Sequence, residues 1–338
     1  MSATLPLGKL SPEYLAELLG NHTFSLPGDR VLVYPGVGED AAVIDMGERW
    51  LVAKTDPITF ATDEIGWYAV HVNANDIAAA GGVPRWFLCT LLLPEGRTDR
   101  AMVERIMGQI ASACRSLRVV PCGGHTEVTY NLDRPVVVGV MLGEIEPGDL
   151  IRSGGVRVGD IVLLTKGIAV EATAIMAREK EAELSSQFSS AFIERCKGFL
   201  HDPGISVVRE ASIATSTAPV HAMHDPTEGG VATGLWELAI ASKVGLEVDG
   251  DAIPVLDETR QLCRVFGLDP LGVIASGALL IAVSEPDAER TCAALLAAGI
   301  RAAPIARAVP ADRSLTLRTA SGVRPLPRFD QDEITRLF

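Results

Sequence analysis

The sequence predicts a two-domain α+β protein, and three observations support this prediction. The chain has 338 residues, which exceeds the usual size of a single hydrophobic core. Segments of strand length alternate with segments of helical periodicity along the chain. A turn-rich stretch near the middle contains Pro147-Gly148-Asp149 and Ser153-Gly154-Gly155. We therefore expect one domain over residues 1–150 and a second over residues 151–338.

The first domain is expected to contain both helices and strands. Ser11 precedes a short helix as its N-cap, and Gly81-Gly82 ends a longer one, because glycine is a natural C-cap. Thr98 or Asp99 caps a third. The expected helices are 11–19, 64–80 and 99–117, and the expected strands are 41–44, 50–55, 86–93 and 135–145.

The second domain shows the same alternation of short apolar runs and amphipathic segments. A turn opens the helix that begins near Gly229. The expected helices are 170–180, 189–199, 206–215, 229–242 and 286–298, and the expected strands are 161–164, 278–283, 305–308 and 315–317.

Composition excludes several classes of protein. The formal net charge is −13, from 30 basic and 43 acidic residues, which argues against a nucleic-acid partner. The six cysteines form no CxxC pair, so a zinc knuckle is not expected. No apolar run approaches the roughly 20 residues of a membrane span, and the N-terminus has no signal pattern. We therefore expect a cytoplasmic protein without a membrane partner.

Four aspartates lie where burial or a tight turn is expected. Asp40 follows a glycine-rich turn, Asp56 ends an apolar strand, Asp76 lies in an apolar helix, and Asp225 lies in His224-Asp225-Pro226-Thr227. A buried carboxylate needs a cation or strong donors, and Mg²⁺ is held by such carboxylates together with nucleotide phosphates. Taken singly, each aspartate could instead be a turn residue, a strand-end cap or a solvated helix position.

Phosphate binding would require a segment other than a P-loop, because the pattern GxxxxGK[ST] is absent. Gly36 and Gly38 fit a dinucleotide pattern, but the following residues predict a strand where that motif requires a helix. The segment Gly123-Gly124-His125-Thr126 predicts either an anion-binding turn or a plain hairpin turn with a surface histidine. Lys166 follows a strand and lies either near phosphates or in a solvated turn.

These motifs, in this order, resemble the aminoimidazole ribonucleotide (AIR) synthetase superfamily, and among its members most of all the hydrogenase maturation proteins of the HypE type. The resemblance rests on Gly36-x-Gly38-Glu39-Asp40, Thr55-Asp56, Asn73-x-Asn75-Asp76, Gly123-Gly124-His125-Thr126 and Asp225-Pro226-Thr227-x-Gly229-Gly230. It covers the chain from about Gly8 to beyond Val283.

The resemblance implies an AIR synthetase-like fold with ATP and Mg²⁺ as cofactors. The N-terminal domain would bind ATP and dimerise through its sheet. Asp76, Asp225 and His125 would take part in catalysis. The implied metal ligands are Asp40, Asp56, Asp76 and Asp225, and the implied nucleotide contacts are Gly36, Gly38, Asn73, Asn75, Gly123, Gly124, Thr126 and Lys166.

The implied reaction is phosphorylation, with dehydration as a further step, of an amide, carbonyl or thiol acceptor. HypE proteins end in a cysteine that carries the carbamoyl group, whereas no cysteine follows Cys292 here. We therefore expect a separate small-molecule acceptor or one borne on a protein. The alternatives are a non-catalytic nucleotide-binding accessory of a maturation partner, HypE-like activity with the thiol supplied by a partner, and thiamine-monophosphate kinase activity.

Overall fold

The chain divides into two compact units, and each is described by itself. The computed structural model describes residues 5, 10–36, 38–58, 63–329 and 331–338. The N-terminal unit comprises Arg30–Tyr34 and Asp40–Leu150. The C-terminal unit comprises Ile151–Phe338 together with Pro35–Glu39 and the segment before Arg30. The helix α1 (Pro12–His22), expected in the first domain, therefore groups with the C-terminal unit.

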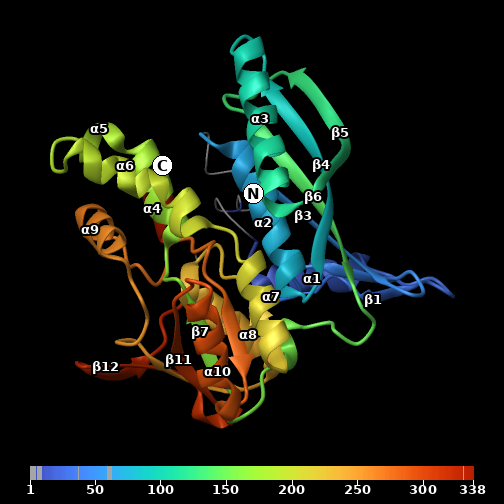
Figure 1. The fold of residues 1–338 in the computed structure, drawn as a ribbon, viewed down its shortest axis with the longest axis vertical. Coiled ribbons are helices and arrows are strands. Elements are labelled where there is room, and N and C mark those ends of the chain that lie inside the picture. Colours follow the sequence, from blue (N-terminus) through green and yellow to red (C-terminus); the bar gives the residue numbers. More distant parts are fainter. Residues whose placement is uncertain (1–4, 6–9, 37, 59–62, 330) are drawn as a thin grey trace. The chain divides into compact units, whose positions relative to one another are not determined.

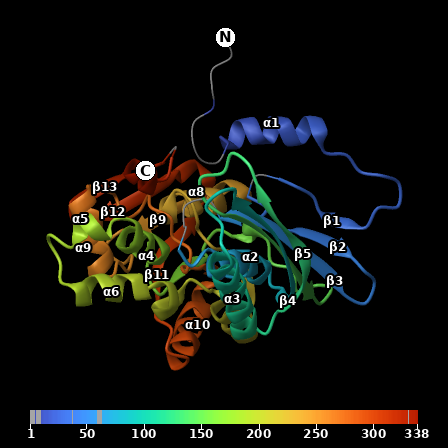
Figure 2. The same ribbon diagram turned by 90° about the horizontal axis from the view of Figure 1, so that it is seen from above.

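A six-stranded sheet forms the N-terminal unit, with two helices on one of its faces (Figures 1 and 2). The strand order is β1-β2-β3-β6-β4-β5, and all neighbours are antiparallel except β4 and β5. The strands are β1 (Val31–Val33), β2 (Ala42–Asp45), β3 (Trp50–Ile58), β4 (Val83–Pro94), β5 (Val120–Thr129) and β6 (Val136–Ile145), and the helices are α2 (Ile65–Ala79) and α3 (Arg100–Leu117).

Helix α2 lies unusually close to the sheet, and two glycines of β6 allow this approach. A Cβ atom on Gly139 would collide with the amide of Asn73, and one on Gly143 would collide with the side chain of Ile77. Because every residue of α2 except Trp67 is buried, this helix is the core of the unit. Its polar residues are therefore held against β3 and β6, away from bulk water.

The expected helices of this unit are confirmed, and one expected turn is wrong. The side chain of Asp99 accepts a hydrogen bond from the Met102 N–H at 2.8 Å and caps α3. The segment from Gly123 to Thr126, expected as a turn, lies within the regular strand β5. Gly124 is required there because a Cβ atom would collide with the carbonyl oxygen of Cys89 on β4.

The C-terminal unit contains a seven-stranded mixed sheet in the order β13-β12-β9-β11-β7-β10-β8. Its strands are β7 (Ile161–Thr165), β8 (Val220–His224), β9 (Gly245–Asp249), β10 (Leu280–Val283), β11 (Ala302–Val309), β12 (Leu315–Thr319) and β13 (Gly322–Pro325). Its further helices are α4 (Val170–Glu179), α5 (Glu181–Leu184), α6 (Ser190–Gly198), α7 (Val208–Thr217), α8 (Gly230–Ser242), α9 (Asp257–Phe266) and α10 (Glu285–Ala297).

Helix α8 supplies much of this unit's core. Val231, Leu235 and Leu238 pack with sheet residues such as Leu164 and Leu280, and all five are fully buried. The described helices include none with the length and hydrophobicity that crossing a bilayer requires.

Candidate active site

Two of the four predicted aspartates meet at one lysine between β3 and α2. Lys54 Nζ lies 3.2 Å from Asp56 Oδ2 and 3.3 Å from Asp76 Oδ2. Lys54 and Asp56 are two residues apart on β3, so their side chains point to the same face of the sheet. Asp76 approaches from α2 and is only 7% exposed. Lys54 was not among the residues predicted from the sequence, although it lies only two residues before Asp56.

Asn73 fixes the position of Asp56. Its Oδ1 accepts a hydrogen bond from the Asp56 N–H at 2.8 Å, and its Nδ2 donates to the carbonyl oxygens of Asp56, at 3.2 Å, and Ala69, at 2.8 Å. These bonds join α2 to β3 beside the carboxylates. Because both ends of the buried amide are used in this way, the geometry favours a positioning role for Asn73 over the expected contact with a nucleotide. Asn75, two residues further along α2, is also completely buried.

Asp40 extends this group of acids. A carboxylate oxygen of Asp40 and one of Asp76 lie within 4.8 Å of each other, close enough to bind one metal ion. Asp40 precedes β2, so the segment after the glycine-rich turn enters a strand, and the exclusion of a dinucleotide motif is confirmed. Gly36 and Gly38 form the turn itself, where the Glu39 N–H donates to the Gly36 carbonyl at 3.2 Å and Gly38 has a φ of +83°.

Carboxylates outnumber ammonium groups among these four side chains. Asp56 and Asp76 contact the ammonium group of Lys54, and a third carboxylate, that of Asp40, lies beside Asp76. Carboxylate oxygens are the ligands that Mg²⁺ takes in proteins, so these residues fit a divalent ion that also binds phosphates.

The fourth aspartate of the sequence pattern belongs to the C-terminal unit. Asp225 follows β8 and is 2% exposed. The turn after it requires glycine, because Gly229 and Gly230 have φ values of +76° and +64°. The chain's C-terminal segment holds this turn, since Asp332 Oδ2 accepts a hydrogen bond from the Gly229 N–H at 2.7 Å.

The residues of β5 lie away from these carboxylates within one chain. Two strands, β6 and β4, separate β3 from β5, which is three strand spacings or about 14 Å. His125 is 65% exposed, and its Nε2 lies 3.0 Å from Glu127 Oε2. The structure therefore does not bring His125, Gly123, Gly124 or Thr126 together with Asp76 in one copy of the chain.

The ammonium group of Lys166 contacts three oxygen atoms inside the C-terminal unit. Its Nζ lies 2.8 Å from Glu210 Oε1 and donates to the carbonyl oxygens of Gly204, at 2.9 Å, and Ser206, at 2.6 Å. Burial lowers the pKa of Lys166, and the charge of Glu210 opposes that shift. Because three oxygens already surround the ammonium group, the geometry favours a structural role over the expected phosphate contact.

Glu171, at the start of α4, is a buried acid that was not predicted from the sequence. Burial raises the pKa of Glu171 to about 8, and the negative charges of Glu228 and Asp332 add to the shift. Burial likewise raises the pKa of Asp332 to about 6, against the opposing effect of its backbone hydrogen bonds. Nothing in the local sequence of α4 distinguishes this glutamate from a solvated one.

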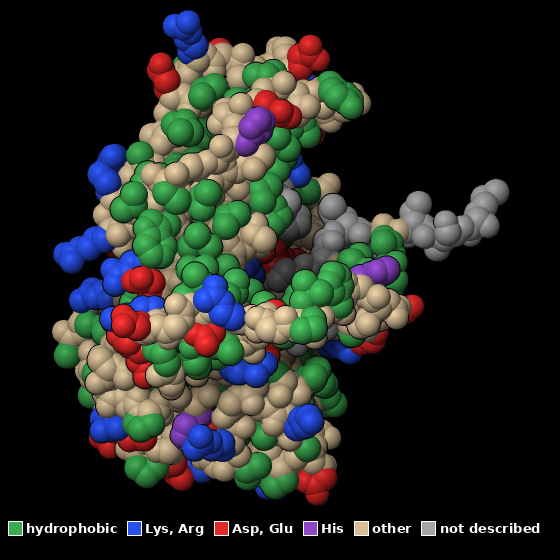
Figure 3. Space-filling model, turned by 90° about the vertical axis from the view of Figure 1, so that its right-hand side faces the viewer, with side chains coloured by type: hydrophobic (Ala, Val, Ile, Leu, Met, Phe, Trp, Pro, Cys, Tyr) green, Lys and Arg blue, Asp and Glu red, His purple; other side chains and the backbone are tan. Residues whose placement is uncertain are grey.

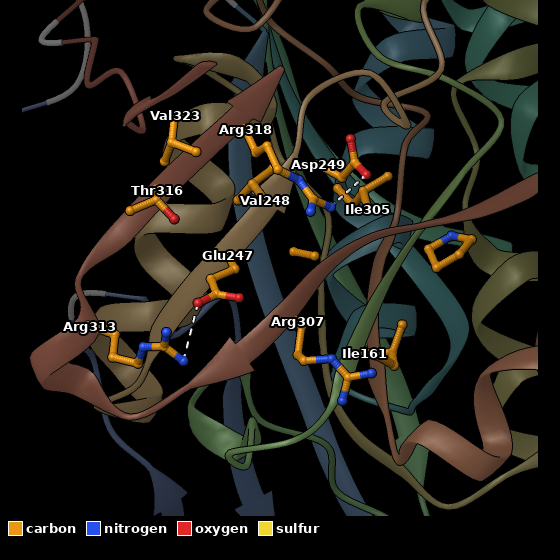
Figure 4. A pocket seen from close by; sticks show the side chains of 12 residues that line it. Ile161, Glu247, Val248, Asp249, Ile305, Arg307, Arg313, Thr316, Arg318 and Val323 are labelled. Atoms are coloured by element: carbon orange, nitrogen blue, oxygen red, sulfur yellow. Dashed lines mark hydrogen bonds and ion pairs between the residues drawn. The ribbon is translucent and has the colours of Figure 1, made fainter. Parts of the chain in front are cut away.

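A hollow of about 690 Å³ lies on the C-terminal sheet (Figure 4). The arginines that line it pair with neighbouring acids: Arg318 Nη2 lies 3.1 Å from Asp249 Oδ2, and Arg313 Nη1 lies 3.4 Å from Glu247 Oε1. Arg307 pairs with Glu285. This balance of charges contrasts with the acidic excess beside Lys54, so we do not assign the nucleotide to this hollow.

Comparison with known proteins now identifies the family. The model of the AIR synthase related protein matches with its N-terminal domain over residues 38–145 and with its C-terminal domain over residues 157–317. A carbamoyl dehydratase HypE from Rhizobium leguminosarum bv. viciae is 31% identical over 284 residues, 81% of this chain and 78% of that protein. A putative hydrogenase expression/formation protein from Methanocaldococcus jannaschii is 29% identical over 75% of this chain and 73% of its own length.

Solved structures agree with this result. The crystal structure of a hydrogenase maturation protein HypE in complex with ATP has a TM-score of 0.72 and 27% identity, and the match covers 87% of this chain and 89% of that one. The two-domain AIR synthetase-like fold expected from the sequence is thereby confirmed. The chain therefore belongs to the AIR synthase-related family, together with the HypE enzymes.

Proposed function

We propose that this protein is a Mg²⁺-dependent enzyme that transfers the γ-phosphoryl group of ATP to an amide, carbonyl or thiol acceptor. The observation that carries the proposal is the meeting of Asp56 and Asp76 at Lys54, with Asp40 beside Asp76. Family membership supports the use of ATP, because a HypE protein of the same fold has been solved with ATP bound.

The aspartates have distinct roles in this proposal. Asp40, Asp56 and Asp76 hold the metal ion, and Asp225 is proposed as a further ligand on the grounds of its sequence motif. Bound Mg²⁺ would neutralise charge on the transferring phosphoryl group. Asn73 keeps α2 and β3 together, so the carboxylates of Asp56 and Asp76 stay in place while the oxygen or sulfur atom of the acceptor attacks the γ-phosphorus and ADP leaves.

The acceptor is proposed from the similar proteins. Several of them are carbamoyl dehydratases, which act on an amide-type group. For this chain we propose a related acceptor, either a small molecule or a group carried by a partner protein. If the phosphorylated oxygen of an amide then leaves as phosphate and the nitrogen loses its protons, the net reaction is dehydration.

We also propose that the working protein is a homodimer joined through the N-terminal sheets. All of β5 from Val120 to Val128 is exposed, and among the described residues this strand pairs only with β4. Val120 and Val128 are each 56% exposed and Tyr130 is 73% exposed. Figure 3 shows hydrophobic side chains gathered over this part of the molecule. A second copy at this edge would cover them and would place His125 and Thr126 at the interface, near which the family resemblance puts ATP.

Isothermal titration of the full chain with a non-hydrolysable ATP analogue, with and without Mg²⁺, tests the proposal. We expect binding that requires Mg²⁺. Asp249→Asn serves as the control, because Asp249 pairs with Arg318 in the hollow of the C-terminal sheet, and its affinity should equal that of the wild type. If nothing binds in either condition, the proposal is wrong.

A further inference from the structure

The C-terminal segment, residues 326–329 and 331–338, packs tightly within the C-terminal unit. The Glu333 N–H donates a hydrogen bond to the Gly272 carbonyl oxygen at 3.0 Å. The ring of Phe329 fills the space that a Cβ atom on Gly272 would need, and Ile334 is fully buried. This segment is therefore an integral part of the unit that also contains Asp225.

Asp332 connects the segment to the turn that follows Asp225. It is buried, and both of its carboxylate oxygens accept hydrogen bonds: Oδ1 from the Ile334 N–H at 2.8 Å and Oδ2 from the Gly229 N–H at 2.7 Å. The first bond caps the short 3₁₀ helix Glu333–Leu337, and the second reaches another element. Because a buried N–H without an acceptor is costly, the observed conformation of the turn depends on the Asp332 carboxylate.

Asp225 lies between two anchored points of the backbone. On one side, His224 ends β8 and pairs with Leu280 of β10. On the other side, Gly229 and Gly230 adopt positive φ values, and the N–H of Gly229 is bound to Asp332. Glycine has no side chain that restricts φ, so hydrogen bonds to the turn, more than local sterics, select this conformation.

We infer that Asp332 is a positioning residue for Asp225: by binding the Gly229 N–H, it holds the turn in the conformation that directs the Asp225 carboxylate to the metal ion. This inference rests on the proposed function, in which Asp225 is a metal ligand. It adds that the C-terminal segment supports metal binding indirectly. Partners that orient a metal ligand typically contribute about 10- to 100-fold to metal affinity.

Three variants separate this role from a general contribution to folding. Asp332→Ser can still cap the Ile334 N–H, because serine is a good N-cap residue, but its side chain is too short to reach Gly229. Asp332→Asn removes the charge and keeps an oxygen at the same distance from the backbone. Arg336→Met is the matched control. Arg336 Nη1 donates to the Gly267 carbonyl oxygen at 3.1 Å, so this variant removes a contact of the same segment that does not involve the turn.

The test is titration of the full chain with Mn²⁺ in the presence of a non-hydrolysable ATP analogue, followed by electron paramagnetic resonance. We expect Asp332→Ser to weaken Mn²⁺ binding by about tenfold, Asp332→Asn to weaken it less, and Arg336→Met to match the wild type. In an Asp225→Asn background, Asp332→Ser should have no further effect on Mn²⁺ affinity, because the ligand that Asp332 positions has gone.

Hydrogen exchange provides a second measurement, which needs neither metal nor nucleotide. If Asp332 holds the turn, backbone amides over residues 225–233 should exchange faster in Asp332→Ser than in the wild type or in Arg336→Met. Unchanged exchange over these residues would contradict the inference. Circular dichroism of each variant confirms that it is folded, and Asp332→Asn takes the place of Asp332→Ser if the latter is not.

The failures of the two proposals are distinguishable. Equal Mn²⁺ affinity in Asp332→Ser and the wild type would overturn the role of Asp332 and leave the proposed function intact. The same fold-loss with and without the Asp225 carboxylate would also overturn it, because the effect would then be a general loss of structure. A wild type that binds no Mn²⁺ with the nucleotide would overturn the proposed function, and the link from Asp332 to the metal with it.

Discussion

The two units treat buried charge in different ways, and the difference shows which buried charges mark a functional site. In the C-terminal unit, Lys166 meets Glu210 and two carbonyl oxygens, so its charge and its donors are satisfied. In the N-terminal unit, one lysine is shared by Asp56 and Asp76, with Asp40 close by. The ion pair of Lys166 and Glu210 is explained by the fold alone, whereas three carboxylates beside one ammonium group on rigid elements fit a divalent ion.

Glu171 represents a third case, in which the buried carboxyl group is protonated. It lies in the same unit as Glu228 and Asp332, whose charges add to the effect of burial, and its pKa is raised to about 8. At neutral pH this carboxyl is therefore mostly protonated. Burial alone is thus a poor guide to function, because it accompanies a balanced ion pair, a neutral acid and an acidic excess.

The largest expected effect concerns the ion pair of Lys166 and Glu210, to which we assign a structural role. Lys166→Met leaves Glu210 buried without its cation, so we expect the free energy of unfolding to fall by about 3 to 5 kcal/mol. Urea denaturation measures this loss. The nucleotide affinity of the protein that remains folded should not change. A variant of normal stability that has lost nucleotide binding would reverse the assignment and make Lys166 a phosphate ligand, as the sequence first suggested.

The next effect concerns the carboxylates of the candidate site, Asp40, Asp56 and Asp76. Asp76→Asn removes a metal ligand from the centre of the cluster, so we expect the affinity for the Mg²⁺–nucleotide complex to fall by about 100-fold. The fold should be retained, because asparagine has nearly the same shape. Titration with and without Mg²⁺ provides the internal control, since only the Mg²⁺-dependent part of the binding should be lost. An unchanged affinity would exclude Asp76 as a metal ligand.

A third effect depends on pH. Between the usual Glu171 pKa of 4.5 and its raised value of about 8, the folded state keeps a proton that the unfolded state releases. The free energy of unfolding therefore falls as the pH rises through this window, by about 2 to 4 kcal/mol. Glu171→Gln cannot ionise, so its stability should equal that of the wild type near pH 4 and exceed it near pH 8.

The exposed Glu183→Gln on α5 is the control for this measurement. Its side chain is 63% exposed, so its stability should follow that of the wild type at every pH. Parallel curves for Glu171→Gln and the wild type would show that Glu171 ionises normally in the folded protein.

Local signals in the sequence predicted the elements that position the site. Helical periodicity and the glycine pair after Ala80 located α2, and the N-cap at Asp99 located α3. The strand β5 was missed because Gly123-Gly124 is typical of turns, whereas here Gly124 is needed for close pairing with Cys89. That requirement comes from a neighbouring strand and has no local signature.

The candidate site was predicted only in part, because the roles of some of its side chains also depend on neighbouring elements. Unusual aspartates such as Asp76 can be recognised in the sequence because they interrupt apolar segments. Lys54 and Asn73 could not be assigned their roles, because those roles depend on how α2 lies against β3. Family resemblance suggested candidate site residues and did not indicate that Asn73 fixes the backbone of Asp56.

The most direct test of the acidic excess is the position of the metal itself. Crystals of the full chain grown with Mn²⁺ and a non-hydrolysable ATP analogue allow the ion to be located by anomalous diffraction. We expect a peak within coordination distance of the Asp76 and Asp56 carboxylates. A bound nucleotide whose metal lies away from both aspartates would contradict this expectation.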